Sequence, residues 1–251
     1  RVTVLEARQP PVIAPGGSPP SGEDVEAFDV RVSALTPRSM DFLRSLGVWE
    51  AIDAQRHCPY AHMTVWDAEG TGRIDFDAAE VAAPCLGSIV ENRVISAALA
   101  LRLRDFANVE LRAPARLTDL ERDGQGNTLT LDDGSRLRCD LLVAADGALS
   151  PTREQLGLRT REWDYGHRAI VTTARFERGH AHTAWQRFLP TGPLALLPLA
   201  SASERLCSIV WSIDENEADA LLEKDDEAFA AALTTASEAV LGDVTDCSPR
   251  R

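Results

Sequence analysis

The residues best suited to chemistry follow one apolar run near the middle of the chain. Leu141 to Ala145 predict a strand buried on both faces, and Asp146 and Gly147 stand where that strand ends. Ser150 and Pro151 then predict the start of a helix, with Ser150 as its cap. Ligands of open α/β sheets bind at the carboxyl ends of strands, so Asp146 is placed to hold a sugar hydroxyl or a water beside a diphosphate.

The same residues have a simpler interpretation. A strand, a turn and a capped helix also call for an Asp that forms the turn and a Ser that caps the helix, without any ligand. Residue chemistry alone leaves both interpretations open.

Glu6 is a second candidate, because it closes the apolar run Val2 to Leu5 near the beginning of the sequence. An acid at the end of the second strand of a dinucleotide-binding fold accepts hydrogen bonds from the adenosine ribose. The glycine-rich turn expected before such a strand is absent, since Gly124, Gln125 and Gly126 lie in a predicted hairpin. We therefore expect a strand and a glycine-rich turn upstream of this sequence; a simple charged strand end is the alternative.

Further patterns predict the elements that position these candidates. Thr36 and Pro37 indicate the start of a helix that ends at Gly47, after a Pro- and Gly-rich loop over residues 9–26. The other predicted elements are a hairpin over 62–76 with its turn at 69–72, a helix over 92–104, short strands between 109 and 143 with turns at 123–124 and 133–134, an antiparallel sheet of 169–176, 183–189, 194–199 and 206–213, and helices over 214–222 and 225–236.

Composition argues against several classes of protein. The 251 residues carry a net charge of -13 with scattered basic residues, which disfavours nucleic-acid binding and leaves at most peripheral membrane contact. No apolar run approaches the ~20 residues of a membrane span, and the first residues do not form a signal sequence, so we expect a cytoplasmic protein. Five cysteines at irregular spacing, and His180 and His182 without a third ligand, predict no metal site.

Asp146, Gly147, Ser150 and Arg153 together resemble the second flavin-binding fingerprint of the FAD-dependent aromatic-ring hydroxylases, the flavin monooxygenases of the para-hydroxybenzoate-hydroxylase type. Longer runs resemble the branch of this family that acts in ubiquinone biosynthesis. These runs are DVRVSALTPRSMDFLRSLGVW (29–49), IVENRV (89–94), WDYGHRAIV (163–171) and HTAWQRFLPTGPLALLPL (182–199), and the resemblance covers nearly the whole chain.

The resemblance implies an α/β fold in which a Rossmann-like, dinucleotide-binding FAD domain is interleaved with an antiparallel-sheet substrate domain. Residues 1–48 and 86–160 would form the FAD-binding part, and residues 49–85 and 161–251 the substrate-binding part. The family's downstream Gly-Asp motif is missing as well, so we expect a chain truncated at both ends, with an incomplete FAD-binding part. Residues 1–251 alone are accordingly expected to be inactive.

The resemblance also implies site residues. Arg31 would lie beside the diphosphate or ring of the flavin, and Glu91, Asn92 and Arg93 would face the cofactor from the start of their helix. The residues alone also fit a solvated strand charge at Arg31 and a helix cap at Asn92. No catalytic base is predicted, and the predicted cofactor-binding residues are Glu6, Arg31, Glu91, Asn92, Arg93, Asp146, Gly147, Ser150 and Arg153.

The activity implied by the resemblance is hydroxylation of a polyprenylated phenol ring in ubiquinone biosynthesis. NAD(P)H would reduce FAD, and O2 would supply the oxygen atom added to the ring. The implied partners are the prenylated phenol, O2 and a ubiquinone-biosynthesis complex. Two alternatives remain: a related flavoenzyme with another reaction, such as a polyprenyl reductase, and a cofactor-free binding module of a biosynthetic complex.

Overall fold

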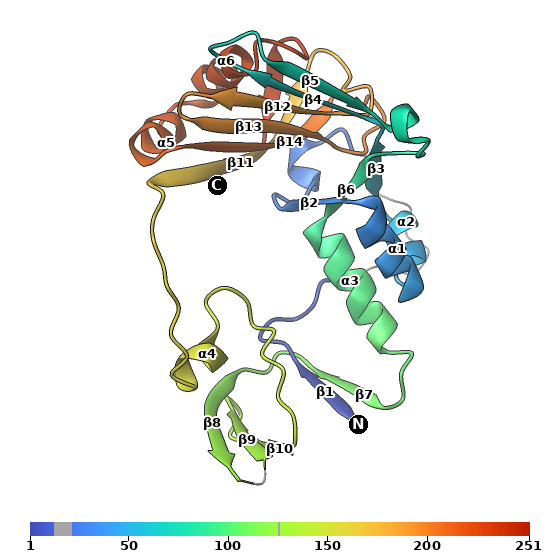
Figure 1. The fold of residues 1–251 in the computed structure, drawn as a ribbon, viewed down its shortest axis with the longest axis vertical. Helices are drawn as coiled ribbons and strands as arrows, with labels where there is room; N and C mark the ends of the chain where they lie inside the picture. Colours follow the sequence, from blue (N-terminus) through green and yellow to red (C-terminus); the bar gives the residue numbers. More distant parts are fainter. Residues whose placement is uncertain (13–21, 125) are drawn as a thin grey trace. The chain divides into compact units, whose positions relative to one another are not determined.

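The computed structural model describes residues 1–12, 22–124 and 126–251, which divide into two compact units (Figure 1). The first unit comprises Arg1–Pro11 and Ala100–Asp164, and the second comprises Val12–Leu99 and Tyr165–Arg251. Gln125 and much of the loop predicted over 9–26 lie outside the described residues. The predicted separation into an FAD-binding part and a substrate-binding part concerns function, and it stays a prediction.

The second unit contains a seven-stranded sheet in the order β15-β11-β14-β13-β12-β4-β5 (Figure 1). Its strands are β4 (His62–Asp67), β5 (Arg73–Asp77), β11 (His167–Phe176), β12 (Thr183–Leu189), β13 (Gly192–Pro198), β14 (Leu206–Asp214) and β15 (Val244–Cys247). The predicted hairpin and the predicted antiparallel strands are confirmed. They form one sheet because β12 pairs with β4 in parallel, while the other ladders are antiparallel.

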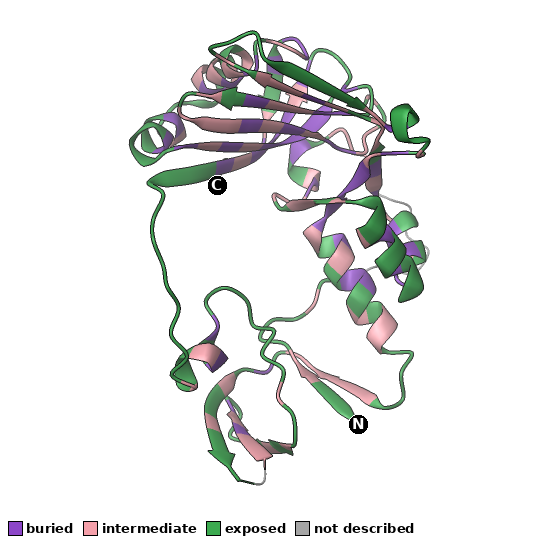
Figure 2. Cartoon of the chain, viewed as in Figure 1, coloured by how far each residue is buried: buried purple, intermediate pink, exposed green. Residues whose placement is uncertain are grey.

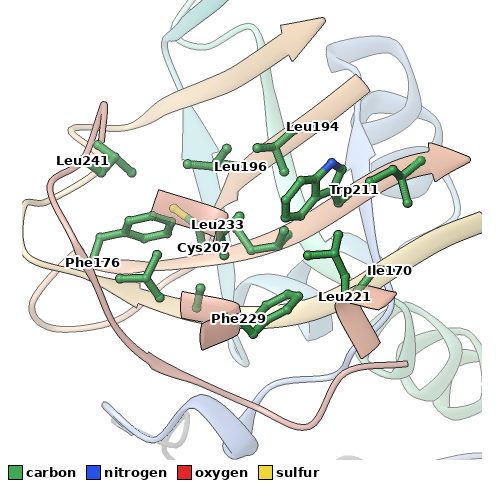
Figure 3. Close-up of a cluster of buried hydrophobic side chains, with 14 of the residues drawn as sticks. Ile170, Phe176, Leu194, Leu196, Cys207, Trp211, Leu221, Phe229, Leu233 and Leu241 are labelled. Carbon is green, nitrogen blue, oxygen red and sulfur yellow. The ribbon is translucent and has the colours of Figure 1, made fainter. Parts of the chain in front are cut away.

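Two helices, α5 (Glu215–Leu222) and α6 (Asp226–Ala236), pack their apolar residues against one face of this sheet. Successive side chains of a strand point to opposite faces, so alternate residues of β11, β13 and β14 enter the same core. Figure 3 shows Phe176, Leu194 and Trp211 from the strands meeting Phe229 and Leu233 from α6. The predicted helices are confirmed, and the Asp225 carboxylate caps α6 by accepting from the Ala228 N–H.

A smaller antiparallel sheet of the second unit leads to the candidate site. Its order is β2-β6-β3, and β6 is buried along its whole length. Thr36 caps the helix that begins at Pro37, as expected. Among the described residues, no helix is long and apolar enough to cross a bilayer. The elements here are η1 (Val25–Ala27), β2 (Val32–Leu35), α1 (Pro37–Ser45), α2 (Trp49–Asp53), β3 (His57–Tyr60), η2 (Ala78–Val81), β6 (Gly87–Glu91) and α3 (Asn92–Leu103), which runs into the first unit.

The first unit pairs β1 with β7 in parallel and adds an antiparallel meander of three strands. Its elements are β1 (Val2–Leu5), β7 (Val109–Arg112), β8 (Leu117–Asp123), β9 (Gly126–Leu131), β10 (Arg136–Cys139) and α4 (Pro151–Gln155). The short strands predicted between 109 and 139 and the predicted turns between them are thereby confirmed.

The buried strand predicted over Leu141 to Ala145 does not form. Leu141 and Val143 are 77% and 74% exposed, and the segment is exposed along most of its length (Figure 2). A strand needs a neighbour for its backbone hydrogen bonds, and no strand of the described chain pairs with this run. Apolar composition alone therefore did not decide strand formation or burial here, because both depend on a neighbouring strand.

We predict that Phe229→Ala lowers the free energy of unfolding by about 3–5 kcal/mol, the usual cost of emptying a fully buried aromatic site. Phe229 is 0% exposed and contacts Trp211 within the core. Phe42→Ala is the control, because Phe42 is 63% exposed and should change that free energy by about 0.5 kcal/mol or less. Urea unfolding followed by circular dichroism measures both, and equal losses would contradict the assignment of the core.

Candidate cofactor site

The candidate residues of the second unit gather around a buried carboxylate, that of Glu91 at the end of β6. Glu91 is 2% exposed, and it is paired with Arg56, which is 6% exposed. The Arg56 guanidinium binds both carboxylate oxygens, Nε to Oε2 at 2.7 Å and Nη2 to Oε1 at 3.0 Å. A buried charge needs this compensation, and the two-point geometry is the one that arginine forms best.

Glu91 also fixes the backbone that leads into β2. Its Oε1 accepts from the Asp29 N–H at 2.6 Å and from the Arg93 side chain at 3.0 Å. The Asp29 carboxylate in turn accepts from the N–H groups of Arg31 at 3.1 Å and Arg93 at 3.0 Å. The Asn92 N–H donates to the Arg31 carbonyl at 2.9 Å, so the start of α3 and the start of β2 are held together.

Charge balance in this cluster singles out Arg31. Glu91 and Asp29 offset the charges of Arg56 and Arg93, all four being joined by the hydrogen bonds above. Arg31 is exposed, and its guanidinium has no ion pair or hydrogen bond within the described part of the chain. The group therefore presents one uncommitted cation next to the first turn of a helix, an arrangement suited to an anionic ligand.

Glu6 lies in the first unit, one residue past β1. Its backbone N–H donates to the Arg112 carbonyl at 3.0 Å, so the residue continues the parallel pairing with β7. The carboxylate is exposed, and its Oε1 accepts from the Arg8 N–H at 3.0 Å. The other oxygen, Oε2, has no hydrogen-bond partner within the described residues, so it is available as an acceptor.

The motif from Asp146 to Arg153 closes on itself by hydrogen bonds. The Ser150 hydroxyl donates to Asp146 Oδ1 and accepts from the Arg153 N–H, and the Thr152 N–H donates to Asp146 Oδ2 at 3.0 Å. The Arg153 guanidinium then donates to the Ala148 carbonyl at 2.6 Å. This network explains the spacing of the four residues, because Ser150 and Arg153 hold the loop that carries Asp146 and Gly147.

The Asp146 carboxylate is a persistent anion. Burial opposes its ionisation, but the hydrogen bonds from Ser150 and Thr152 outweigh that effect and lower its pKa from 3.8 to about 2. A lowered pKa means that the stability contributed by this group is present above pH 3.8 and is lost as the pH falls towards 2. At neutral pH the group is thus a charged acceptor.

Gly147 supplies the space beside that acceptor. Its φ is +88°, a conformation that residues with a Cβ rarely adopt. Apart from Gly147 and its two neighbours in the chain, no atom of the described residues lies within 4 Å of the place where a Cβ would stand. The loop therefore exposes its backbone to close approach by a ligand.

Comparison with known proteins decides the family. A family model described as "FAD binding domain" matches residues 23–248. The chain belongs to this family. FAD is accordingly the cofactor, and the predicted resemblance to the ubiquinone-biosynthesis hydroxylases is confirmed by curated relatives.

Two relatives and one solved structure describe the similarity. The chain is 36% identical to the 3-demethoxyubiquinol 3-hydroxylase of Escherichia coli (84% of this chain, 50% of the relative). It is 37% identical to a mitochondrial ubiquinone biosynthesis monooxygenase of Xenopus tropicalis (94% and 50%). A probable FAD-dependent monooxygenase from Pseudomonas aeruginosa shares the fold, with a TM-score of 0.74 at 18% identity over 99% of this chain and 65% of that chain.

These comparisons confirm the mixed α/β fold of a flavin monooxygenase. The chain spans about half the length of the curated relatives it matches.

The structure brings Arg31, Glu91, Asn92 and Arg93 together in one group of the second unit. In the first unit, Asp146, Gly147, Ser150 and Arg153 share one loop, and Glu6 follows β1. Sequence reasoning missed Asp29 and Arg56. The sequence could have indicated Asp29, because an Asp in a turn often accepts a hydrogen bond from the backbone N–H two residues later, as it does here from Arg31. No pattern in the sequence indicates Arg56, because its partner Glu91 lies 35 residues away.

We predict that Asp146→Asn slows flavin reduction by NAD(P)H, or lowers FAD retention, by about tenfold or more, because Asn lacks the charge. Asn keeps the shape and one acceptor, so the loss of stability should be about 1 kcal/mol. Stopped-flow reduction and thermal melting of the native protein measure the two effects. Asp133→Asn is the matched control, because Asp133 is a turn aspartate of the same unit that accepts from the Ser135 N–H. A rate of flavin reduction and an FAD occupancy equal to those of the wild type in Asp146→Asn would refute the site assignment.

Proposed function

We propose that the native protein is an FAD-dependent monooxygenase that hydroxylates a polyprenylated phenol ring in ubiquinone biosynthesis, with NAD(P)H as reductant and O2 as co-substrate. The observation that carries the proposal is 36–37% identity to two hydroxylases of that pathway over 84–94% of this chain. The proposal extends to a cytoplasmic enzyme with at most peripheral membrane contact, working with a ubiquinone-biosynthesis complex.

The residues of the site fit FAD. The cofactor carries an anionic diphosphate and several sugar hydroxyls, and each unit, taken by itself, offers partners for such groups. Arg31 is a cation without an ion-pair partner in the described chain, beside the N-terminal turn of α3. Asp146 and Glu6 are anionic acceptors of the kind that bind hydroxyls in charge-assisted hydrogen bonds.

Some of these residues would contact FAD, and the others would hold the contacting residues in place. We assign contact with FAD to Arg31, Asn92, Glu6, Asp146 and the open backbone of Gly147. Support falls to Glu91, Arg93, Ser150 and Arg153, whose side chains are engaged within the protein. Asp146 and Asn92 also accept hydrogen bonds, from Ser150, Thr152 and Ser33, but each carboxylate oxygen can accept a second bond, and the Asn92 amide nitrogen donates to no group of the described residues. Glu91 in particular is buried and accepts several hydrogen bonds, so its role is to place its neighbours.

When bound, FAD supplies the redox chemistry, namely acceptance of a hydride from NAD(P)H and activation of O2. The protein's part is to bind and orient the cofactor and to keep water from the reacting groups. Arg31 would neutralise the diphosphate, and the ionised Asp146 would hold a hydroxyl or an ordered water in place. No catalytic base is assigned, since a phenol ring is electron-rich without one.

The reaction is tested with a prenylphenol, NAD(P)H and isotopically labelled O2. We expect the native protein to place one labelled oxygen atom in a new ring hydroxyl, detected by mass spectrometry of the product. Labelled water in place of labelled O2 is the control and should leave the product unlabelled. Reduction of the prenyl chain without oxygen insertion would instead indicate a reductase, and a purified protein without flavin absorbance would indicate a binding module.

We predict that Glu6→Ala weakens FAD binding by about tenfold to a hundredfold, because a hydrogen bond to a charged acceptor contributes about 1.5–3 kcal/mol. The melting temperature should stay near that of the wild type, since the Glu6 side chain is exposed. Titration of the apoprotein with FAD measures the Kd. Glu121→Ala serves as control, because this exposed acid pairs only with Arg136 among the described residues; an unchanged Kd in folded Glu6→Ala would mean that Glu6 is a strand-end charge.

A further inference from the structure

Arg56 lies outside the motifs that suggested the cofactor site, yet it donates to both oxygens of Glu91, the carboxylate on which the hydrogen bonds of this group converge. It precedes β3, it is 6% exposed, and its Cζ stands 3.8 Å from the centroid of the Phe28 ring. We propose that Arg56 is a positioning residue for FAD, acting through Glu91 and Asp29 on Arg31. This inference rests on the proposed function.

The first step links Arg56 to Glu91. Arg56 reaches both oxygens of the carboxylate, and its Nη2 also donates to the Ala27 carbonyl at 2.9 Å. Arg93 is a weaker substitute, because its side chain is 46% exposed and, of the two Glu91 oxygens, contacts Oε1 alone in the described structure. The orientation of the buried carboxylate therefore depends on Arg56, and a single ammonium group cannot reproduce the two-point contact.

The second step links Glu91 to the backbone of Arg31. Glu91 Oε1 accepts from the Asp29 N–H, and Asp29 Oδ1 accepts from the Arg31 N–H. The Ala27 carbonyl accepts from both Arg56 and Arg93, so the same short segment is fixed from its other side. A turn bonded at Ala27, Asp29 and Arg31 has little freedom to move.

The third step concerns affinity. The guanidinium of Arg31 is exposed, and the long side chain must be ordered when a ligand binds. A fixed backbone lowers that entropic cost, because the guanidinium then has fewer positions available before the ligand binds. Loss of the Arg56 contacts should raise the Kd for FAD about tenfold while leaving Arg31 itself in place, the size of effect typical of one supporting charge-assisted hydrogen bond.

The test is a double-mutant cycle in the native protein with Arg56→Lys, Arg31→Ala and the double variant. We expect Arg56→Lys and Arg31→Ala each to raise the Kd for FAD, and the double variant to bind no more weakly than Arg31→Ala alone. Fluorescence titration with FAD gives the Kd, and thermal melting of each apoprotein reports folding. A merely structural Arg56 would lower the melting temperature without this dependence on Arg31.

Arg187→Lys is the matched control. Arg187 is also buried, pairing with Glu238 at 2.6 Å and donating to the Ala236 carbonyl at 2.8 Å at the end of α6. We expect this variant to lower the melting temperature as Arg56→Lys does and to leave the Kd unchanged. A rise in Kd equal to that of Arg56→Lys would show that loss of stability alone weakens binding, which overturns the inference.

Asp29→Asn covers the case in which Arg56→Lys does not fold. Asn has one acceptor in place of two, so it cannot serve both N–H groups that Asp29 bonds, and its effect on Kd should likewise vanish in an Arg31→Ala background. An unchanged Kd in folded Arg56→Lys or Asp29→Asn, or additive losses in the double variants, overturns the inference alone. A wild-type protein that binds no FAD overturns the proposed function and this inference with it.

Discussion

The second unit depends on the neutralisation of one carboxylate. Glu91 ends a strand that is buried along its whole length, and a charge in that position costs several kcal/mol unless cations and hydrogen-bond donors surround it. Arg56, Arg93 and the Asp29 N–H meet this need, and in doing so they join β2, β3 and α3 at one point. Arg31 is left without an ion-pair partner among the described residues, because Glu91 and Asp29 are already bonded to Arg56 and Arg93.

The Asp146 loop obeys a different constraint, that of a short chain segment that must satisfy its own polar groups. Ser150 serves at once as donor to Asp146 and as acceptor for the Arg153 N–H, so one hydroxyl closes the turn and begins α4. A motif whose members bond to one another keeps its shape without help from a surrounding sheet. This explains how the loop keeps its hydrogen bonds although the apolar run before it is exposed.

Sequence patterns anticipated the elements that are defined locally. Thr36 and Asp225 are helix caps, and the Asp-Gly pair at 133–134 forms the expected turn, because the residues that decide these structures lie within one turn of each other. Patterns failed where the deciding partner is distant. The apolar run at Leu141 has no strand beside it among the described residues, and the partner of Glu91 comes from a segment without periodicity. Family resemblance supplied the candidate site, but only coordinates separated residues with free polar groups, such as Arg31, from residues whose groups are engaged, such as Ser150.

The parallel pairing of β12 with β4 has a consequence for how the protein is made. His62 lies opposite Thr183 in the finished sheet, so the two strands leave the ribosome far apart in time. During synthesis the β4–β5 hairpin must wait with Trp66 lacking the Trp185 ring that it contacts in the finished sheet, and an isolated two-stranded hairpin is at best marginally stable. Closing so long a loop is slow compared with local hairpin formation, which makes this strand pair a late event in folding. Until β12 is made, the β4–β5 hairpin therefore lacks the strand that pairs with the other edge of β4.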